Sequence, residues 1–376
     1  MTTDLAVLLP SLLPEDDVAL AVEGLKELGF TTAVDLAFLS TIPPHPSLPP
    51  STFSRLQAAV VAHLGAPSTS GAYLLQKHDD RKGKQPQRFS SSLEELDDHL
   101  AGGFELGDVV EICGPPRSGR TAVALYAILL HLLLHPDKRA AWLDTGGTFD
   151  PYRCLAILRD VIIPRLVDMG GSFAGDDEVE PEPEKLAITV LDRLAVSRVG
   201  KSGDALDTLT AETRVTDTSD TLDMVVIDQL DALLGGAPLS GTSAQGPANL
   251  VAFMRRLSSL AQSSALPLVI FVITTASPPA PTSSSTSRPT APKQLPSQPP
   301  PLSSLPLPTP LKPALGSTYT YLLDISLLVL PAEPLFGPKD GRGNYLLEVT
   351  KNPRGRTGGL VAFSLENGVK LEQLEQ

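Results

Sequence analysis

The chain has 376 residues, of which 42% are hydrophobic and 36 are proline, and its formal net charge is −13. This length suits one large domain with a smaller one, and the negative charge leaves only local basic clusters as candidates for nucleic-acid contact. Two cysteines without paired spacing exclude a disulfide framework and a zinc site, and the longest apolar run, residues 122–134, is too short to cross a membrane.

The N-terminal region, residues 1–65, predicts a small all-α domain. Apolar residues recur at three- and four-residue intervals from Val18 to Leu28, and Gly29 is a natural helix terminator. Two shorter helices are expected at residues 33–39 and after Ser51, which could cap the second of them. The first residues carry acids and no basic segment, so they do not resemble a secretory signal and indicate a cytoplasmic or nuclear protein.

Residues 66–92 are rich in Gly, Ser, Pro and mixed charge, which is typical of a flexible linker. From residue 93 to 376, short β-rich runs alternate with helical segments. This alternation predicts an α/β domain with a mostly parallel central sheet flanked by helices. The expected strands lie at residues 109–113, 140–144, 187–190, 224–228, 268–274, 327–330, 345–350 and 360–365.

Two inserts interrupt the large domain. The acidic stretch at residues 176–184 is expected to be a solvated loop. Residues 276–313, dense in Pro, Ser and Thr, carry too little apolar surface to fold alone, so we expect this second insert to be disordered.

The strongest motif fits the spacing of a phosphate-binding loop, G-x-x-x-x-G-[K]-[ST], with arginine in the lysine position. Backbone N–H groups of such a loop and the positive end of the next helix hold phosphate oxygens, while Thr121 could bind Mg²⁺. The alternative is an ordinary turn between a strand and a helix. The loop residues are Gly114, Pro115, Pro116, Arg117, Ser118, Gly119, Arg120 and Thr121.

Asp228 supplies a second candidate site residue, because it ends the apolar run Leu222 to Asp228 and could hold the same Mg²⁺ through water. The alternative is a buried strand that ends in a solvent-exposed carboxylate. Arg120 keeps the positive charge of the usual lysine, but its planar fork is not equivalent at a phosphate. Nucleotide binding could therefore survive while catalysis suffers.

The segments SLEELDDHLAGGFELGDVVEICGPPRSGRT, AAWLDTGGTFDPYRC, LDMVVIDQLDALL, PLVIFVITT and EVTKNPRGRTGGLVAFSL resemble, in this order, the RecA-type recombinases. With LKPALGS and the helical N-terminal module, the chain looks most similar to the D-type paralog of the eukaryotic recombinase. The resemblance implies a RecA-like core with a P-loop NTPase site, ATP and Mg²⁺ as cofactors, and an adenine-packing role for Arg153. It also implies a nuclear protein of homologous-recombination DNA repair.

Three positions depart from the active recombinases. Glycine at position 146 stands where they carry the glutamate that activates water, Ala276 replaces a polar γ-phosphate sensor, and Arg120 replaces lysine. Loss of a general base costs a factor of about 10² to 10⁴ in rate. We therefore expect ATP binding with slow hydrolysis and assign no catalytic residue.

The expected partners are other RecA-like recombinase paralogs in a hetero-oligomer that helps load the recombinase on single-stranded DNA. The candidate DNA contacts are two basic clusters, Lys77 to Arg88 and Lys351 to Arg356, each of which could instead be a solvated surface. The apolar island at residues 72–75 could dock on a neighbouring subunit or on its own domain. Two alternatives remain open: an active DNA-dependent ATPase or strand-exchange enzyme, and a scaffold that works without nucleotide.

Overall fold

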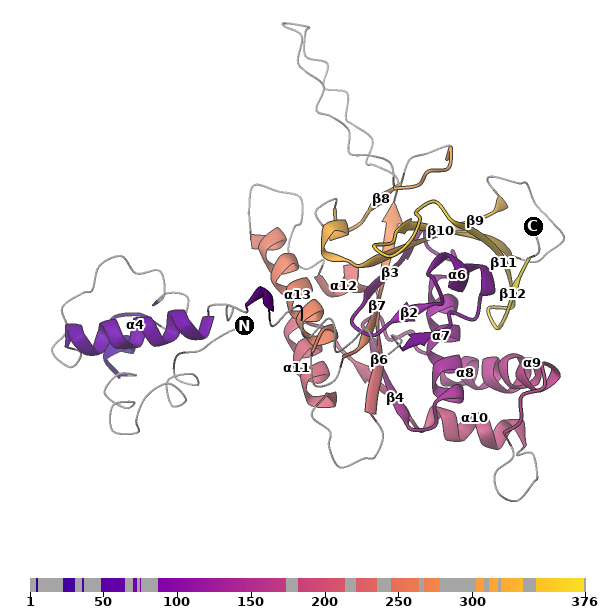
Figure 1. The fold of residues 1–376 in the computed structure, drawn as a ribbon, viewed down its shortest axis with the longest axis horizontal. Helices are drawn as coiled ribbons and strands as arrows, with labels where there is room; N and C mark the ends of the chain where they lie inside the picture. The colour runs from indigo at the N-terminus through magenta and orange to yellow at the C-terminus, as the bar shows by residue number, and fades with distance from the viewer. Residues whose placement is uncertain are drawn as a thin grey trace, which may run out of the picture. The chain divides into compact units, whose positions relative to one another are not determined.

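The chain divides into two compact units, Met1–Gln85 and Pro86–Gln376 (Figure 1). The computed structural model describes residues 5, 23–30, 36, 49–64, 70–72, 75, 87–173, 182–213, 221–234, 245–263, 267–277, 302–307, 311–316, 319–333 and 343–374. The predicted loop at 176–181, the basic residues 77–84 and most of the Pro/Ser-rich insert lie outside these residues.

The described residues of the first unit form helices and turns, without a strand among them. Helix α4 (Pro50–Leu64) buries Phe53, Leu56 and Val60 completely. The side-chain amide of Gln57 donates to the carbonyl of Leu36 at 3.1 Å, which joins α4 to a second helical segment. The helix starts at Pro50 rather than after the predicted Ser51 cap, because proline suits the first turn, where its missing N–H costs nothing.

A largely parallel sheet organises the second unit. Its strand order is β12-β11-β10-β9-β3-β7-β6-β4-β5, with β8 paired to β7. The six strands from β9 to β5 run parallel, while β10, β11 and β12 continue the sheet as an antiparallel meander. The predicted α/β fold with a mostly parallel central sheet flanked by helices is therefore confirmed.

The strands of this sheet are β3 (Val109–Gly114), β4 (Lys138–Asp144), β5 (Leu194–Arg198), β6 (Thr221–Asp228), β7 (Val269–Ser277), β8 (Lys312–Pro313), β9 (Ile325–Pro331), β10 (Gly343–Lys351), β11 (Leu360–Glu366) and β12 (Lys370–Gln373). A separate two-stranded sheet joins β1 (Arg88–Phe89) to β2 (Phe104–Glu105).

Helices cover both faces of the large sheet (Figure 1). One face packs on α7 (Arg120–Leu134), α8 (Pro151–Ile157), the π-helical turn η1 (Leu158–Ile162), α9 (Ile163–Asp168) and α10 (Pro183–Leu191). The other packs on α11 (Ser202–Glu212), α12 (Leu230–Leu234), α13 (Gln245–Ala261) and the 3₁₀ turn η2 (Tyr319–Leu322). Alternate residues of the central strands point into the two cores: Ile112 faces α7, whereas Val109 faces α13.

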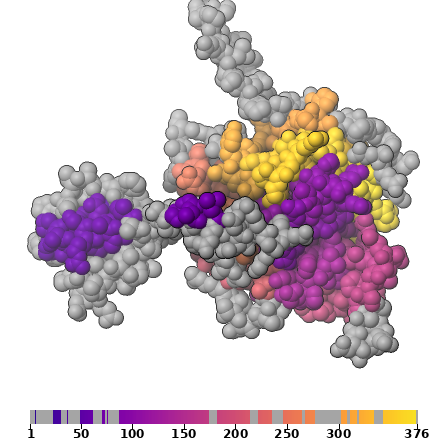
Figure 2. Space-filling model, viewed as in Figure 1, coloured from indigo at the N-terminus to yellow at the C-terminus, as the bar shows by residue number. Residues whose placement is uncertain are grey.

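The C-terminal strands lie against α6 (Glu94–His99), as Figure 2 shows in yellow and purple. The backbone N–H of Glu95 donates to the side chain of Gln373 at 3.2 Å, and the amide of Asn352 donates to the carbonyl of His99 at 3.0 Å. These contacts join the first elements of the unit to its last strands. None of the described helices is both long and apolar enough to cross a membrane.

Three expectations about the elements need correction. Residues 187–190, predicted as a strand, lie in helix α10, and the strand at this place is β5. A short apolar run does not distinguish a buried strand from a buried helix turn. Strand β1 falls within the predicted linker 66–92, so the ordered core begins before residue 93.

The third correction concerns the end of the insert at residues 276–313, which was expected to be disordered. Residues 302–307 pack against the sheet through Leu302, Leu305 and Leu307. The buried carboxylate of Glu348 accepts hydrogen bonds from the hydroxyls of Ser303 and Ser304. Composition alone did not predict this, because the partners are supplied by β10, more than forty residues away.

Candidate functional site

The phosphate-binding loop links the end of β3 to the start of α7 and has the backbone that its glycines predict. A Cβ placed on Gly114 would lie 2.1 Å from the carbonyl oxygen of Val329 on the neighbouring strand. Gly119 adopts φ +87° at the N-cap of α7, a conformation that side chains rarely tolerate. Both glycines are thus required by the path of the chain.

The other loop residues surround the N-terminus of α7. Pro116 and Arg117 are exposed, and Thr121 lies half-buried in the first turn of the helix. Ser118 is fully buried, and its hydroxyl has no hydrogen-bond partner among the described residues. The loop therefore offers the positive end of a 15-residue helix and one unused hydroxyl, both of which suit an anion.

Arg120 directs its guanidinium to the carboxyl end of β7. Its Nη1 donates to the carbonyl oxygen of Thr274 and, at 3.3 Å, to the hydroxyl of Thr275. Burial lowers the pKa of Arg120, while the carboxylates of Asp231 and Asp228 oppose that effect. The side chain thus joins the first turn of α7 to β7, a role that the loop pattern did not reveal.

Asp228 ends β6 with a carboxylate that is only 3% exposed. Burial, followed by the negative charge of Asp144, raises the pKa of Asp228 from its ordinary value of 3.8 to about 6. Its Oδ1 has no hydrogen-bond partner within the described part of the chain. An unsatisfied carboxylate near a phosphate loop is a suitable ligand for a hard cation or for a water bound to one.

Asp144, which faces Asp228 in register at the end of β4, is a site residue that sequence reasoning missed. Its Oδ1 accepts hydrogen bonds from the N–H groups of Gly146, Gly147 and Thr148 at 3.2, 2.8 and 3.1 Å. Its Oδ2 accepts a fourth from Phe149 at 3.2 Å. The carboxylate therefore shapes the loop that carries position 146, and an aspartate followed by Thr-Gly-Gly-Thr is a turn signal that could have indicated this.

Thr145 connects the ends of two strands. Its hydroxyl lies 2.6 Å from the carbonyl oxygen of Asp228 and 3.1 Å from that of Gln229. The loop after β4 is therefore fixed against the end of β6. This brings the predicted magnesium ligand Asp228 and the departure at Gly146 to the same edge of the sheet.

Arg153, predicted to pack on adenine, extends from α8 to the hairpin between β11 and β12. Its Nε donates to the carbonyl oxygen of Gly368 at 2.8 Å. Its positive charge also helps to lower the pKa of Asp228. The hairpin turn at Asn367 and Gly368, both with positive φ, thus holds the arginine at the border of the site.

A buried polar network lies behind the loop. Glu111 on β3 is fully buried and accepts hydrogen bonds from the hydroxyls of Thr274 at 2.6 Å and Ser326 at 2.7 Å. Burial raises the pKa of Glu111. Because Thr274 also supplies the carbonyl that Arg120 contacts, the network fixes the strand end on which Arg120 rests.

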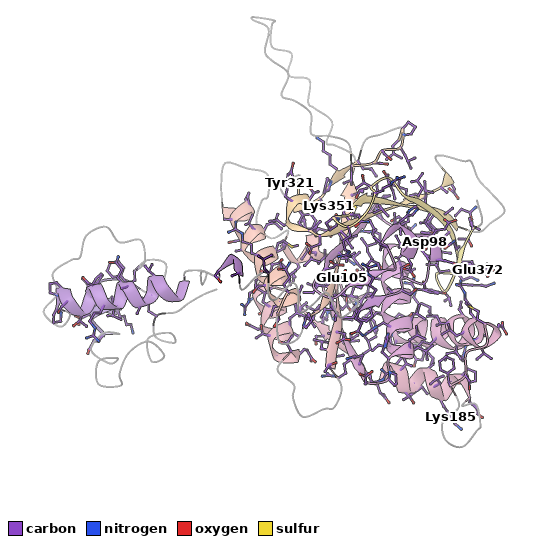
Figure 3. All side chains as sticks on the ribbon, in the orientation of Figure 1. Asp98, Glu105, Lys185, Tyr321, Lys351 and Glu372 are labelled. Atoms are coloured by element: carbon purple, nitrogen blue, oxygen red, sulfur yellow. The ribbon has the colours of Figure 1, made fainter. Side chains whose placement is uncertain are left out.

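Most described residues of the predicted basic clusters serve the fold. Arg354 forms a bidentate ion pair with Asp108 at 2.7 and 2.6 Å, and Arg88 lies 3.7 Å from Glu105. Figure 3 shows Lys351 beside the η2 turn, where its ammonium donates to the carbonyls of residues 320 and 323. Arg356 is exposed.

Both cysteines and His131 behave as core residues. Cys113 and Cys154 are buried free thiols whose pKa values are raised by burial. His131 is buried against the ring of Phe89, and burial lowers its pKa to about 3. The described residues contain no cluster of histidine, cysteine and carboxylate side chains that could hold a metal ion.

No protein-family model matches the chain, but it is similar to known proteins and solved structures. Over 64 residues the chain is 39% identical to the DNA repair and recombination protein RadB of Thermococcus kodakarensis, a segment that is 17% of this chain. The chain thus spans 27% of the length of that relative. The crystal structure of the RadB recombinase is similar with a TM-score of 0.49 and 19% identity, over 76% of this chain and all of the other.

Proposed function

We propose that the chain is an ATP-binding protein of the RecA-type recombinase family that acts in DNA repair by homologous recombination. The observation that carries the proposal is the loop from Gly114 to Thr121, which leaves a buried strand and enters a long helix. A Cβ at Gly114 would clash with the backbone of Val329, and Gly119 has a positive φ that strains other residues. The partial likeness to RadB supports the same assignment.

The residues present fit ATP and Mg²⁺. The N–H groups at the start of α7 and the buried hydroxyl of Ser118 would bind phosphate oxygens. Thr121 and Oδ1 of Asp228, which has no hydrogen-bond partner among the described residues, would hold Mg²⁺, which supplies positive charge against the phosphates. Arg153 stands at the border where the base would lie. The chain's own part is to bind and orient the nucleotide between strand ends.

Slow hydrolysis is part of the proposal. Gly146 offers no group that could accept a proton from water, and Ala276, at the end of β7, is buried and apolar. Arg120 is held by the carbonyl of Thr274 rather than free to follow a phosphate. A nucleotide that binds but is rarely cleaved stabilises the state that binds it.

We further propose a D-type recombinase paralog of the nucleus that joins other RecA-like paralogs and helps to load the recombinase on single-stranded DNA. The LKPALGS segment and the helical first unit support this assignment. Affinity isolation of the tagged protein tests it, because recovery of other RecA-like subunits is expected. Recovery of metabolic enzymes alone would contradict it.

Nucleotide binding is tested by titration of the full chain with a fluorescent ATP analogue, with and without Mg²⁺. Thr121→Val should weaken the magnesium-dependent affinity about tenfold, which corresponds to a loss of about 1.4 kcal/mol of binding free energy. Thr189→Val is the matched control, because Thr189 lies exposed on α10 and its hydroxyl contacts only the carbonyl of Lys185. A chain without saturable binding at millimolar nucleotide would instead be a scaffold that works without ATP.

The hydrolysis defect is tested by restoring the two residues of the active recombinases. Gly146→Glu together with Arg120→Lys should raise turnover if those positions alone are deficient. The glutamate requires the amide of Gln229 to move, because a Cβ at position 146 would lie 2.9 Å from Nε2 of that residue. Wild-type turnover that is already rapid and strongly stimulated by single-stranded DNA would show an active ATPase.

A further inference from the structure

Gln229, directly after β6, has a backbone conformation that non-glycine residues seldom adopt. Its φ is +58°, and its carbonyl accepts the hydroxyl of Thr145 at 3.1 Å and the N–H of Ala232 at 3.0 Å. Its own N–H helps to hold the charge of Asp228. Such conformations persist where surrounding contacts impose them, and they gather at functional sites.

The side chain of Gln229 lies over Gly146. A Cβ built on that glycine would be 2.9 Å from Nε2 and 3.3 Å from both Oε1 and Cδ of Gln229. The amide therefore occupies the space in which a side chain at position 146 would begin. The absence of a glutamate side chain at position 146 therefore leaves the space that the amide of Gln229 fills.

Neither of the carboxylates that end β4 and β6, Asp144 and Asp228, can take over the task of the missing glutamate. Both oxygens of Asp144 are used by the four N–H groups of its own loop. Asp228 is the proposed magnesium ligand. Asp231 is half-buried, and its charge acts on Arg120, where it opposes the lowering of the pKa by burial.

We propose that Gln229 orients the attacking water during the slow ATP hydrolysis, in the place of the absent glutamate. The inference rests on the proposed nucleotide site. A glutamine amide can accept a hydrogen bond from water through Oε1 and donate one to a phosphate oxygen through Nε2, as glutamines do in some GTPases. It holds the water without removing its proton.

The step balances without a protein base. The water oxygen forms a bond to the γ-phosphorus, and the bond between this phosphorus and the oxygen bridging to the β-phosphate breaks. ADP leaves with that electron pair, and the water proton passes to the transferred phosphate. Because the amide only positions the water, the reaction remains slow, consistent with a contribution from orientation alone.

Gln229→Gly and Gln229→Glu test the proposal in the full chain. Glycine suits the positive φ, so the first variant should fold, which the fluorescence of Trp142 verifies. Its affinity for the fluorescent ATP analogue should fall less than its rate of single-turnover hydrolysis, which drops about tenfold or more. Gln229→Glu supplies a proton acceptor and should hydrolyse faster than the wild type.

Binding of fluorescent ADP with aluminium fluoride gives a readout that is independent of turnover. Aluminium fluoride should tighten ADP binding to the wild type, and the glycine variant should lose this gain. Gln262→Ala, at an exposed residue just after the end of α13, is the control and should keep this gain. The inference is overturned if the glycine variant keeps both the tighter ADP binding with aluminium fluoride and the wild-type rate of hydrolysis. It is also overturned if the wild type shows neither tighter ADP binding nor measurable hydrolysis. Absence of ATP binding would overturn the proposed function instead.

Discussion

Replacing Asp228 by asparagine should stabilise the fold at neutral pH while it weakens magnesium-dependent nucleotide binding. The carboxylate is 3% exposed, and its pKa is raised from 3.8 to about 6, mainly by burial and then by Asp144. A raised carboxyl pKa means that the folded state prefers the neutral form. Its charged form, present at pH 7, therefore lowers the free energy of unfolding, and a neutral isostere removes that cost.

The expected magnitude follows from the shift. About two pKa units correspond to ~3 kcal/mol, which is the gain expected for Asp228→Asn at pH 7.5. At pH 5 most folded wild-type molecules already carry the proton, whereas most unfolded ones do not. Protonation in the folded state then restores about half of the stability that the charged carboxylate removes. The free energy of unfolding of the variant should exceed that of the wild type by only ~1.5 kcal/mol.

Denaturant titration of the full chain at the two pH values measures this difference. The single tryptophan, Trp142, is buried in the second unit, so its fluorescence reports the unfolding of that unit. Asp204→Asn, exposed in the first turn of α11, is the control and should lose only a few tenths of a kcal/mol through the helix dipole. A destabilised Asp228 variant, or a gain that is equal at pH 5 and pH 7.5, would refute the reasoning.

Further predictions concern the fold around the site. Tyr126→Phe removes the hydroxyl that donates to the carbonyl of Val369 at 2.6 Å, so the free energy of unfolding should fall by ~1–3 kcal/mol. An unchanged midpoint of denaturation would contradict this. Arg354→Ala leaves the nearly buried carboxylate of Asp108 without its ion pair and should lower the free energy of unfolding by ~3 kcal/mol, which thermal unfolding measures. Full recovery of stability in Arg354→Lys would contradict the role of the bidentate contact. Gly114→Ala should abolish ATP binding in the nucleotide titration, because no space exists for the methyl group.

The central strands could be predicted because each is a predominantly apolar run that ends at or near a polar or glycine residue. This pattern placed β3, β4, β6 and β7, and with them Gly114 and Asp228 at the same edge of the sheet. The run at 187–190 was misassigned because a four-residue apolar segment fits a helix face equally well. The local sequence pattern therefore predicted the central strands around the phosphate loop more accurately than it predicted the surrounding elements.

The side-chain contacts of the site could not be predicted because they join residues that are far apart in the chain. Arg120 meets Thr274 across 154 positions, and Arg153 meets Gly368 across 215. Gln229 lies beside Gly146 without any spacing that marks the pair. Asp144 is the exception, because its four contacts are with the next residues and the Thr-Gly-Gly-Thr turn indicates them.

The candidate site contains buried polar groups whose unfavourable free energy a bound nucleotide would relieve. Asp228 and Ser118 are buried with oxygen atoms that lack partners among the described residues, and Arg120 is largely removed from water. A bound phosphate with its cation offers partners to the first two, so part of the binding free energy becomes stability of the strand ends, ~2.7 kcal/mol at a ligand concentration of 100 Kd. Hydrolysis that exchanges a triphosphate for a diphosphate would withdraw some of these contacts. The slow cleavage proposed for this site would therefore prolong the ordered state, which is the state that the proposed partner subunit would recognise.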